Sequence, residues 1–597
     1  MYRTFFLLIG LLAVARCERL AESDCTYDAA LVSYHPVTDG DGPTMAEANA
    51  RNYQKIIADA ANYGADIVVF PEYSLTSIPK DKGQVKERPM DDAAFRAFFR
   101  DTASRVTPFE VDAIICANET DYYAKSLRMI SCSAQANRVY VVVNHLERVD
   151  CASSDEDCPS DGFLLYNSQV VFDRSGRVVG HYRKYNLFNE PGVNVTAEPM
   201  IWVFGTDFGV TFGTFICFDV LNERPATWFK HQPQVENVVY STHWFNEHPF
   251  HHAMQAFGSY AYAADVNFLV SGYSDGPTQS GGFGVFYGTQ DVHPTINVPV
   301  TKNSLLVARV PKTRRASQAC GRVHAATGLL ALKDYMPGEL PVDTVYKLDS
   351  EGKQIEKLPL LHFREDMSKY KSLVVKPDEE NRATICHNET CCDFHVHWQV
   401  WDKRAEAMAR DRDYKTYTYR MVAFDGVRPF HDFMVAGVQI CAVVACAGPE
   451  LEDCSTRWNS FDNTVLYPSS FRELKIDLKF PAADEQGGAP ERSSYAPTTF
   501  RGVTERSLEP YEYEFKQTEA GVGMELVNRR NRVSMDLLTF GIYGRRFDRD
   551  VVYTENLKHM IEPEQQQQQQ QHDDGSGEKV ESHYCHQDGV DGCIDGR

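Results

Sequence analysis

The sequence lacks an excess of positive charge. Its 597 residues include 61 Lys and Arg against 83 Asp and Glu, which gives a formal net charge of −22. A nucleic-acid-binding protein needs basic surface to displace counterions from phosphates, and an anionic membrane surface attracts basic segments. The charge balance therefore excludes nucleic acid, and equally an anionic membrane surface, as expected partners.

Long hydrophobic segments are missing too. The one sustained apolar run, residues 5–15, is far shorter than the ~20 residues that a membrane-spanning helix needs. It follows Arg3 and ends in small residues, as a secretory signal does, although a buried N-terminal helix is the alternative. The polar C-terminus lacks the apolar tail of a lipid-anchor signal. We expect a signal peptide over residues 1–17 and a secreted, extracellular protein without a membrane anchor.

Cysteine, in contrast, is abundant. Sixteen cysteines in an exported chain are expected to form disulfide bonds. The short spacings predict Cys116–Cys132 and Cys151–Cys158, with the six cysteines between residues 386 and 454 bonded among themselves. A zinc site is the alternative for part of this set, namely Cys386, Cys391 and Cys392 with His387, His395 and His397. Three Asn-x-Ser/Thr sites predict glycans, at Asn118, Asn194 and Asn388.

Residues 26–320 alternate helical and strand patterns. Thr44 and Glu47 have the spacing of a capping box, apolar residues then recur at helical spacing, and Gly64 follows as a stop. Continuous apolar runs typical of strands buried on both faces follow at residues 67–70, 139–143, 212–218, 235–240 and 267–271, with a helix over 249–264. Such alternation predicts an α/β layered domain.

The pattern changes beyond residue 330. Strand-like runs separated by turn-rich stretches occur at residues 417–424, 433–444, 474–480, 511–515 and 533–543. We interpret residues 330–555 as a second, mostly β domain, a sandwich, the alternative being extra strands on the first sheet. Residues 560–597 contain a Gln run and acidic, Gly-rich sequence, which predicts a disordered tail.

Three reactive side chains stand where predicted strands of the first domain end. Glu72 follows a buried strand and Pro71, Lys184 follows a predicted hairpin, and Cys217 ends a hydrophobic strand. The carboxyl edge of an open α/β sheet is where such domains bind their ligands. Taken singly, each residue has an ordinary alternative: a solvated glutamate, a surface lysine and a disulfide-bonded cysteine.

Together, the Pro-Glu, Arg-Lys and Cys-x-Asp segments resemble the nitrilase superfamily, whose triad is Glu-Lys-Cys. Longer segments resemble its vanin/biotinidase branch: residues 170–176 (VVFDRSG), 184–188 (KYNLF), 215–220 (FICFDV) and 385–392 with its double cysteine. This resemblance extends from about residue 25 to residue 550. It implies a nitrilase-type αββα sandwich that carries the site, followed by a mostly β base domain.

The resemblance also implies an activity. The expected reaction is hydrolysis of a linear carbon–nitrogen amide bond through a cysteine thioester, without metal or cofactor. The expected substrate is a small-molecule amide, pantetheine, which would yield pantothenate and cysteamine. The alternatives are biotinidase-like hydrolysis of biotin amides and a secreted binding or structural glycoprotein without turnover. The oligomeric state does not follow from the sequence.

Residue roles follow from the same resemblance. It implies that Cys217 is the nucleophile, Glu72 the general base, and Lys184 the stabiliser of the oxyanion together with the backbone N–H of Phe218. Glu190 is expected to support the lysine or the attacking water, with an ordinary surface glutamate as the alternative. A nearby ammonium favours the thiolate, so we expect a partly ionised Cys217 near neutral pH.

Further residues are assigned to the surroundings of this site. Tyr73 and His243 stand where relatives commonly have an aspartate and a small residue, and both are candidates for the substrate pocket. Trp244 is a third candidate, with core packing as the alternative, and Asp219 is expected to orient the turn after the nucleophile. If Cys17 leaves with the signal peptide, fourteen cysteines besides the nucleophile remain to pair, so Cys217 is expected to be the only free thiol.

Overall fold

The computed structural model describes residues 25–552 apart from residues 79–91, 107–110, 119, 121, 153, 156–157, 191, 276–280, 290–302, 314–327, 337–338, 341–362, 401–413, 431–433, 459–463, 481–488, 520 and 530–535. The expected signal peptide and the expected C-terminal tail lie outside the described residues. No helix of the described part is long and apolar enough to cross a membrane.

The N-terminal domain is built on twelve connected strands in the order β5-β4-β3-β2-β1-β10-β8-β7-β6, with β11 beside β10, and β12 between β1 and β13. The strands are β1 (Thr26–Tyr34), β2 (Ile67–Val69), β3 (Tyr140–Asp150), β4 (Phe163–Phe172), β5 (Val178–Arg183), β6 (Trp202–Gly205), β7 (Thr211–Ile216), β8 (Asn237–Thr242), β10 (Asn267–Tyr273), β11 (Gly284–Phe286), β12 (Ser304–Pro311) and β13 (Gly328–Asp334). The helices are α2 (Gly42–Asn62), α3 (Asp92–Phe99), α4 (Lys125–Asn137), α5 (Trp228–Lys230) and α6 (Ala253–Ala264).

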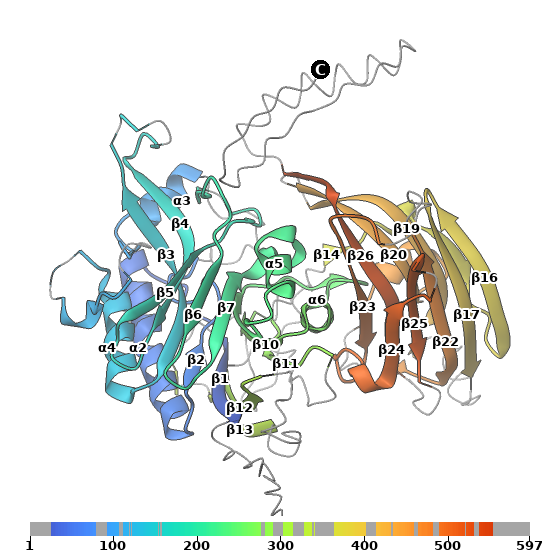
Figure 1. Ribbon diagram of the computed structural model, residues 1–597, viewed down its shortest axis with the longest axis horizontal. Coiled ribbons are helices and arrows are strands. Elements are labelled where there is room, and N and C mark those ends of the chain that lie inside the picture. Colours follow the sequence, from blue (N-terminus) through green and yellow to red (C-terminus); the bar gives the residue numbers. More distant parts are fainter. Residues whose placement is uncertain are drawn as a thin grey trace, which may run out of the picture.

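Side-chain alternation along the strands divides this assembly into layers. On β1, the side chains of Ala30, Val32 and Tyr34 point to one face and pack against α2 and α4. Leu31 points to the other face and packs in a core shared with β8 and β10. On β8, Val239 belongs to that same shared core, and Val238 packs toward α6. Two sheets therefore lie face to face with helices on both outer sides (Figure 1), which is the expected αββα sandwich.

The buried runs form strands as predicted, with boundaries that differ by a few residues. Strand β7 ends at Ile216, so Cys217 begins a short 3-10 helix, η3 (Cys217–Leu221), and does not belong to the strand. The expected capping box at the start of α2 is wrong. Asp41 is the N-cap, and its side chain accepts a hydrogen bond from the Thr44 backbone N–H at 2.8 Å, because Gly42 and Pro43 already belong to the helix.

The C-terminal domain is a sandwich of two five-stranded sheets. One sheet has the order β15 (Lys371–Val374), β19 (Thr418–Phe430), β20 (Met434–Cys446), β26 (Leu537–Val552) and β23 (Ser493–Arg501). The other has the order β16 (Glu379–His387), β17 (Thr390–Val400), β22 (Ser469–Lys479), β25 (Gly523–Asn528) and β24 (Tyr513–Gln517). The two sheets share an apolar core, and a buried disulfide bond between Cys392 and Cys441 joins them. The β segments are thus a separate sandwich and not extra strands of the first sheet.

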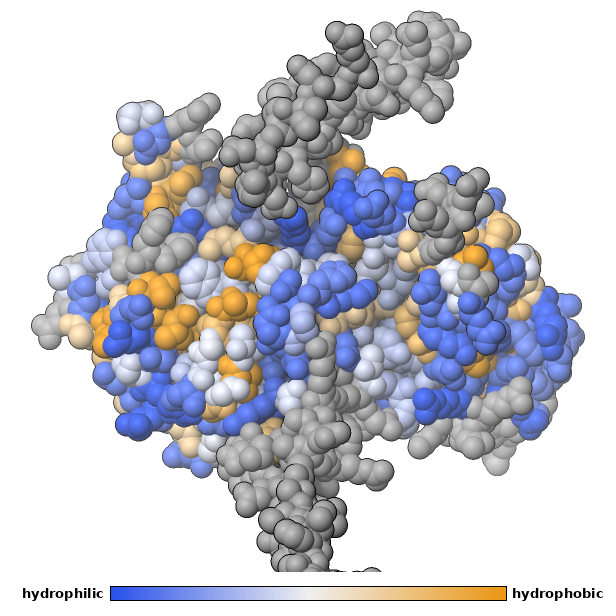
Figure 2. All heavy atoms as spheres, in the orientation of Figure 1, coloured by the Kyte–Doolittle hydropathy of each residue, from blue (hydrophilic) through white to orange (hydrophobic). Residues whose placement is uncertain are grey.

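The two domains pack against each other through α6 and β23 (Figure 1). Gln255 of α6 donates a hydrogen bond to the Thr498 hydroxyl at 2.7 Å, and Ser259 donates to the Pro497 carbonyl at 2.7 Å. Between the domains, β9 (Glu247–His248) pairs with β14 (Phe363–Arg364). Figure 2 shows that polar residues cover most of the visible face of the C-terminal domain, so its apolar side chains are mainly internal.

Candidate active site

The three residues expected to carry the reaction meet at one edge of the sandwich. Glu72 follows β2, Lys184 follows β5 and Cys217 follows β7. Strands β2 and β5 run parallel to each other through β3 and β4, and β7 runs parallel to β8. The carboxyl ends of these strands therefore bring together side chains that lie up to 145 residues apart in the sequence.

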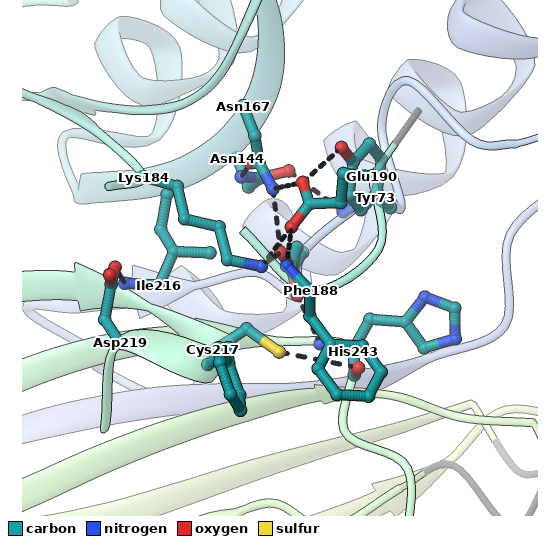
Figure 3. A network of polar contacts seen from close by, with 12 residues as sticks. Tyr73, Asn144, Asn167, Lys184, Phe188, Glu190, Ile216, Cys217, Asp219 and His243 are labelled. Atoms are coloured by element: carbon teal, nitrogen blue, oxygen red, sulfur yellow. Dashed lines mark hydrogen bonds and ion pairs between the residues drawn. The ribbon is translucent and has the colours of Figure 1, made fainter. Parts of the chain in front are cut away.

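A buried lysine shared by two carboxylates is the centre of the site (Figure 3). The Lys184 ammonium lies 2.8 Å from Glu72 Oε1 and 2.5 Å from Glu190 Oε1. The side chains of Lys184 and Glu72 are each 1% exposed and that of Glu190 is 8% exposed, so the surface-glutamate alternative for Glu190 is wrong. Burial opposes the charge on Lys184, but Glu190 and Glu72 raise the pKa of this lysine well above its usual value.

Polar neighbours fix both carboxylates. The Asn167 side-chain amide donates to Glu72 Oε1 and to Glu190 Oε2, both at 2.8 Å. The Tyr73 hydroxyl donates to Glu190 Oε2 at 2.6 Å (Figure 3), and the backbone N–H of His243 donates to Glu72 Oε2 at 2.7 Å. Burial raises the pKa of Glu72 above its ordinary value, despite the Lys184 ammonium. A carboxylate of raised pKa can take and return a proton closer to neutral pH.

The nucleophile candidate stands on a strained turn. Cys217 has φ +46°, a left-handed conformation that costs free energy for a residue other than glycine and that persists only when its surroundings impose it. Asp219 supplies part of that constraint: its carboxylate accepts hydrogen bonds from the Ile216 backbone at 3.1 Å and from the Tyr182 hydroxyl at 2.7 Å. It also binds the backbone N–H of Asn186 at 2.9 Å. Asp219 therefore lies where the sequence predicted, beside the turn that contains Cys217, and its hydrogen bonds hold the neighbouring backbone.

The ionisation expected for Cys217 is wrong. Burial, followed by the charge of Glu72, raises the pKa of the Cys217 thiol far above its ordinary value, and Lys184 opposes this only in part. The main physical reason is that the thiol is buried, and the charge of Glu72 adds to this effect. The thiol donates toward the His243 carbonyl oxygen at 3.5 Å, and it also interacts with the Glu72 carboxylate. The thiol is therefore protonated at neutral pH, with a base beside it.

The pocket candidates have different positions. Tyr73 is buried and, with φ +49°, directs its hydroxyl to Glu190, so it supports the carboxylate. The His243 ring is stacked on Tyr273 with 3.8 Å between ring centroids, and the backbone of His243 contacts Cys217 and Glu72. The Trp244 indole is buried and donates to the His251 carbonyl at 2.9 Å, which agrees with the core-packing alternative.

Aromatic rings line the surroundings of the thiol. Phe188 contacts Phe218 with 5.2 Å between ring centroids and Phe245 with 6.1 Å, and Phe245 lies 4.7 Å from the His243 ring. Phe188 and Phe245 are half-buried. The Phe188 ring lies beside the Cys217 side chain (Figure 3), so it is accessible to a small apolar group that approaches the thiol.

The cysteines pair as the spacing predicts. Disulfide bonds join Cys116 to Cys132, Cys151 to Cys158, Cys386 to Cys391, Cys392 to Cys441 and Cys446 to Cys454. The zinc alternative is wrong, because its three cysteines are bonded and cannot act as thiolate ligands. In the described part of the chain, Cys217 is the one free cysteine, and no group of three or more His, Cys, Asp and Glu side chains could hold a metal ion.

The predicted glycan acceptors differ in their surroundings. Asn388 is exposed, whereas Asn118 and Asn194 are half-buried. The Asn194 side-chain oxygen accepts hydrogen bonds from Arg96 at 3.0 Å and from the Leu165 backbone at 2.9 Å. Glycosylation at the three sites stays a prediction.

Sequence reasoning missed two asparagines of the site. Asn144 donates to the Asn167 side-chain oxygen at 2.6 Å and accepts a hydrogen bond from the Tyr73 backbone at 2.9 Å. Both asparagines are buried. A signal was available, since Asn167 begins the polar run Asn167-Ser168-Gln169 inside an otherwise apolar strand. Buried polar side chains need partners, so such a run indicates a polar network.

Comparisons with known proteins agree with this architecture. The carbon-nitrogen hydrolase family model matches residues 28–268, and the vanin C-terminal domain model matches residues 361–550. Vanin-like protein 3 of Drosophila melanogaster is 28% identical over 92% of this chain and 94% of its own length. Pantetheinase of Mus musculus is 26% identical over 70% of this chain and 72% of its own length. Biotinidase of Bos taurus is 26% identical over 71% and 79%, respectively.

Among solved structures, an amidase from Nesterenkonia sp. aligns with 50% of this chain and 95% of its own length, at 14% identity and a TM-score of 0.33. The family of this chain is therefore assigned from the two family models, the relatives and the layered sheets. The chain belongs to the vanin/biotinidase family of the nitrilase superfamily, and it is a carbon–nitrogen hydrolase that acts on amides other than peptide bonds.

Proposed function

We propose that this protein is a secreted amidase that hydrolyses pantetheine to pantothenate and cysteamine through a thioester on Cys217. The observation that carries the proposal is the buried Glu72–Lys184–Glu190 cluster beside the free thiol. Four relatives named pantetheinase, each 26% identical to this chain, support the substrate. The disulfide bonds, which form in oxidising compartments, and the signal-like N-terminus support secretion.

The acylation half of the reaction uses Glu72 as the base. Glu72 accepts the thiol proton as the Cys217 sulfur attacks the amide carbonyl carbon, which avoids a free thiolate in the resting enzyme. The negative charge that develops on the carbonyl oxygen is stabilised by the Lys184 ammonium and the backbone N–H of Phe218. Glu72 then returns the proton to the leaving amine, the carbon–nitrogen bond breaks, and cysteamine departs from the thioester.

The deacylation half repeats this chemistry with water. Glu72 accepts a proton from water, the oxygen attacks the thioester carbonyl, and the proton passes to the departing Cys217 sulfur. Glu190 does not transfer the proton in this scheme. Its role is to hold Lys184 in place and to balance its charge, with Asn167 and Tyr73 fixing the carboxylate.

Biotin amides are the second candidate substrate. The half-buried rings of Phe188, beside Cys217, and of Phe245, stacked on Phe188, favour an acyl group with an apolar chain, which biotin has to a greater extent than pantothenate. A biotinidase relative supports the same alternative. The third candidate is a glycoprotein without turnover. Such a protein would not need the buried charge cluster, whose desolvation lowers the stability of the fold.

Parallel assays distinguish these candidates. The purified protein is given pantetheine and biocytin at equal concentrations, and released cysteamine and lysine are measured, with the Cys217→Ala variant as the control. Our proposal predicts a higher kcat/KM for pantetheine and no turnover by the variant. A higher kcat/KM for biocytin would assign the protein to biotin-amide hydrolysis, and no turnover of either amide would contradict both candidate substrates.

A further inference from the structure

A buried charge cluster lies where the two domains meet. Arg428 of β19, in the C-terminal domain, forms ion pairs through Nη2 with Glu247 of β9 and through Nε with Glu365, which follows β14. The Arg428 side chain is 7% exposed, and those of Glu247 and Glu365 are 16% and 6% exposed. Although burial opposes it, Arg428 lowers the pKa of Glu247 to about 2.

Such a cluster is not an efficient source of stability. Replacing a buried ion pair by apolar side chains of similar volume is often neutral or stabilising, because both charges lose their hydration. Nη1 of Arg428 is also buried without a hydrogen-bond partner, which adds to the cost. The cluster does, however, fix the direction of one strand of the C-terminal domain relative to the N-terminal domain.

From this cluster, a chain of contacts leads to the nucleophile. Phe430 lies two residues after Arg428 on β19, so both side chains point to the same face of the strand. The guanidinium of Arg428 lies 4.0 Å from the Phe430 ring centroid. The Phe430 ring in turn meets the Phe218 ring edge-on, with 5.0 Å between centroids. Phe218 directly follows Cys217 and is the residue whose backbone N–H we assign to the oxyanion.

The turn at Cys217 has contacts with both domains. Its left-handed backbone is held from within its own domain by Asp219 and by Asn222, whose side-chain amide donates to the Phe218 carbonyl at 2.8 Å. The Phe218 side chain, 3% exposed, packs in a cluster made mostly of C-terminal-domain residues. The ring of Phe218 is thus fixed by the second domain, while its backbone faces the reaction.

We propose that Phe430, held in place by Arg428, is a positioning residue through which the C-terminal domain fixes the Cys217–Phe218 turn for catalysis. This inference rests on the proposed function, since it assumes that Cys217 is the nucleophile. The expected consequence is specific: loosening Phe430 misplaces the sulfur and the oxyanion donor, which lowers kcat. Substrate binding depends on other contacts, so KM changes little.

The test compares matched substitutions on one strand. Phe430→Ala and Phe430→Leu are set against Phe424→Ala and Phe424→Leu in the full-length protein. Phe424 lies on the same strand and is similarly buried, but its ring is stacked on Tyr370 at 4.7 Å and on His387 at 5.3 Å. The measurements are kcat and KM for pantetheine, the melting temperature, and the rate at which iodoacetamide alkylates Cys217.

We expect Phe430→Ala to lower kcat at least tenfold with KM changed less than threefold, and Phe430→Leu, which stays apolar but loses the ring contact with Phe218, to lower kcat at least threefold. The Phe424 variants should keep kcat within twofold at comparable melting temperatures. The alkylation rate of Cys217 should change in Phe430→Ala and not in Phe424→Ala. If Phe430→Ala does not fold, the two leucine variants give the same comparison.

Equal kcat values in the Phe430 and Phe424 variants would overturn the inference and leave the proposed function intact. The Cys217→Ala variant separates the two claims. If it retains turnover, the proposed function fails, whatever the Phe430 variants do. If it is inactive while the Phe430 variants resemble the controls, only the positioning role fails.

Discussion

Lys184→Ala tests whether the buried lysine holds the site together. The position of Lys184 in an Arg-Lys segment predicts a variant that folds normally, but the structure changes that expectation. The substitution would leave the Glu72 and Glu190 carboxylates buried with no ammonium between them. Breaking a buried pair by removing one partner costs about 3–5 kcal/mol.

The size of the loss depends on pH, because the variant can bind a proton instead. An ordinary glutamate has a pKa of 4.5, and each pH unit above that value costs about 1.4 kcal/mol to keep the group protonated. The loss is therefore limited to about 4 kcal/mol at pH 7.5 and about 1.4 kcal/mol at pH 5.5. A carboxylate whose folded-state pKa is raised stabilises the fold below its unfolded pKa, and this contribution is lost as the pH rises.

The assay is thermal unfolding of the wild type and the variant at both pH values, together with steady-state kinetics. We expect a deficit in melting temperature that is clearly larger at pH 7.5, and a kcat about 10²–10³ lower because an oxyanion donor is lost. The matched control is Lys184→Ala/Glu190→Gln, which removes one of the two charges and should regain stability without regaining kcat. A single variant as stable as the wild type at pH 7.5, or no recovery in the double variant, would refute the reasoning.

Three further predictions follow from individual contacts. Tyr73→Phe removes a hydroxyl that holds the Glu190 carboxylate in place, so Lys184 loses part of its support, and steady-state kinetics should show a kcat lower by about tenfold with KM little changed. Native Cys217 should react with iodoacetamide more slowly at pH 7 than glutathione does, because its pKa is raised; a faster reaction would contradict the charge balance. Replacing both Cys392 and Cys441 by alanine should lower the unfolding free energy of the C-terminal domain, measured by urea denaturation, by about 2–4 kcal/mol.

The ends of buried strands were the features that could be predicted best from the sequence. Apolar runs located the strands, and a reactive residue directly after each run placed Glu72, Lys184 and Cys217 at one sheet edge. Local chain direction is enough for this, because parallel strands bring their carboxyl ends together. The disulfide pairs of short spacing were predictable for a similar reason, since a short loop leaves few alternatives.

Features that depend on distant residues could not be predicted in the same way. The raised pKa of Cys217 depends on its burial and on the nearby Glu72 carboxylate, which only the folded chain brings together. Glu190 likewise reaches Lys184 only through the folded turn after β5. Tyr73 could be assigned to the surroundings of the site from its position after Glu72, but its contact with Glu190 spans 117 residues. The packing of Phe430 on Phe218 depends on how the two domains dock, and a local sequence pattern does not predict docking.

Trapping the acyl-enzyme tests the central claim, nucleophilic catalysis by Cys217, most directly. The protein is mixed with pantetheine, quenched in acid during turnover, digested, and mapped by mass spectrometry. The account predicts a pantothenoyl thioester on the peptide that contains Cys217, cleaved by hydroxylamine and absent from Cys217→Ala. Turnover of pantetheine by Cys217→Ala, or an acyl group carried by another residue, would contradict it.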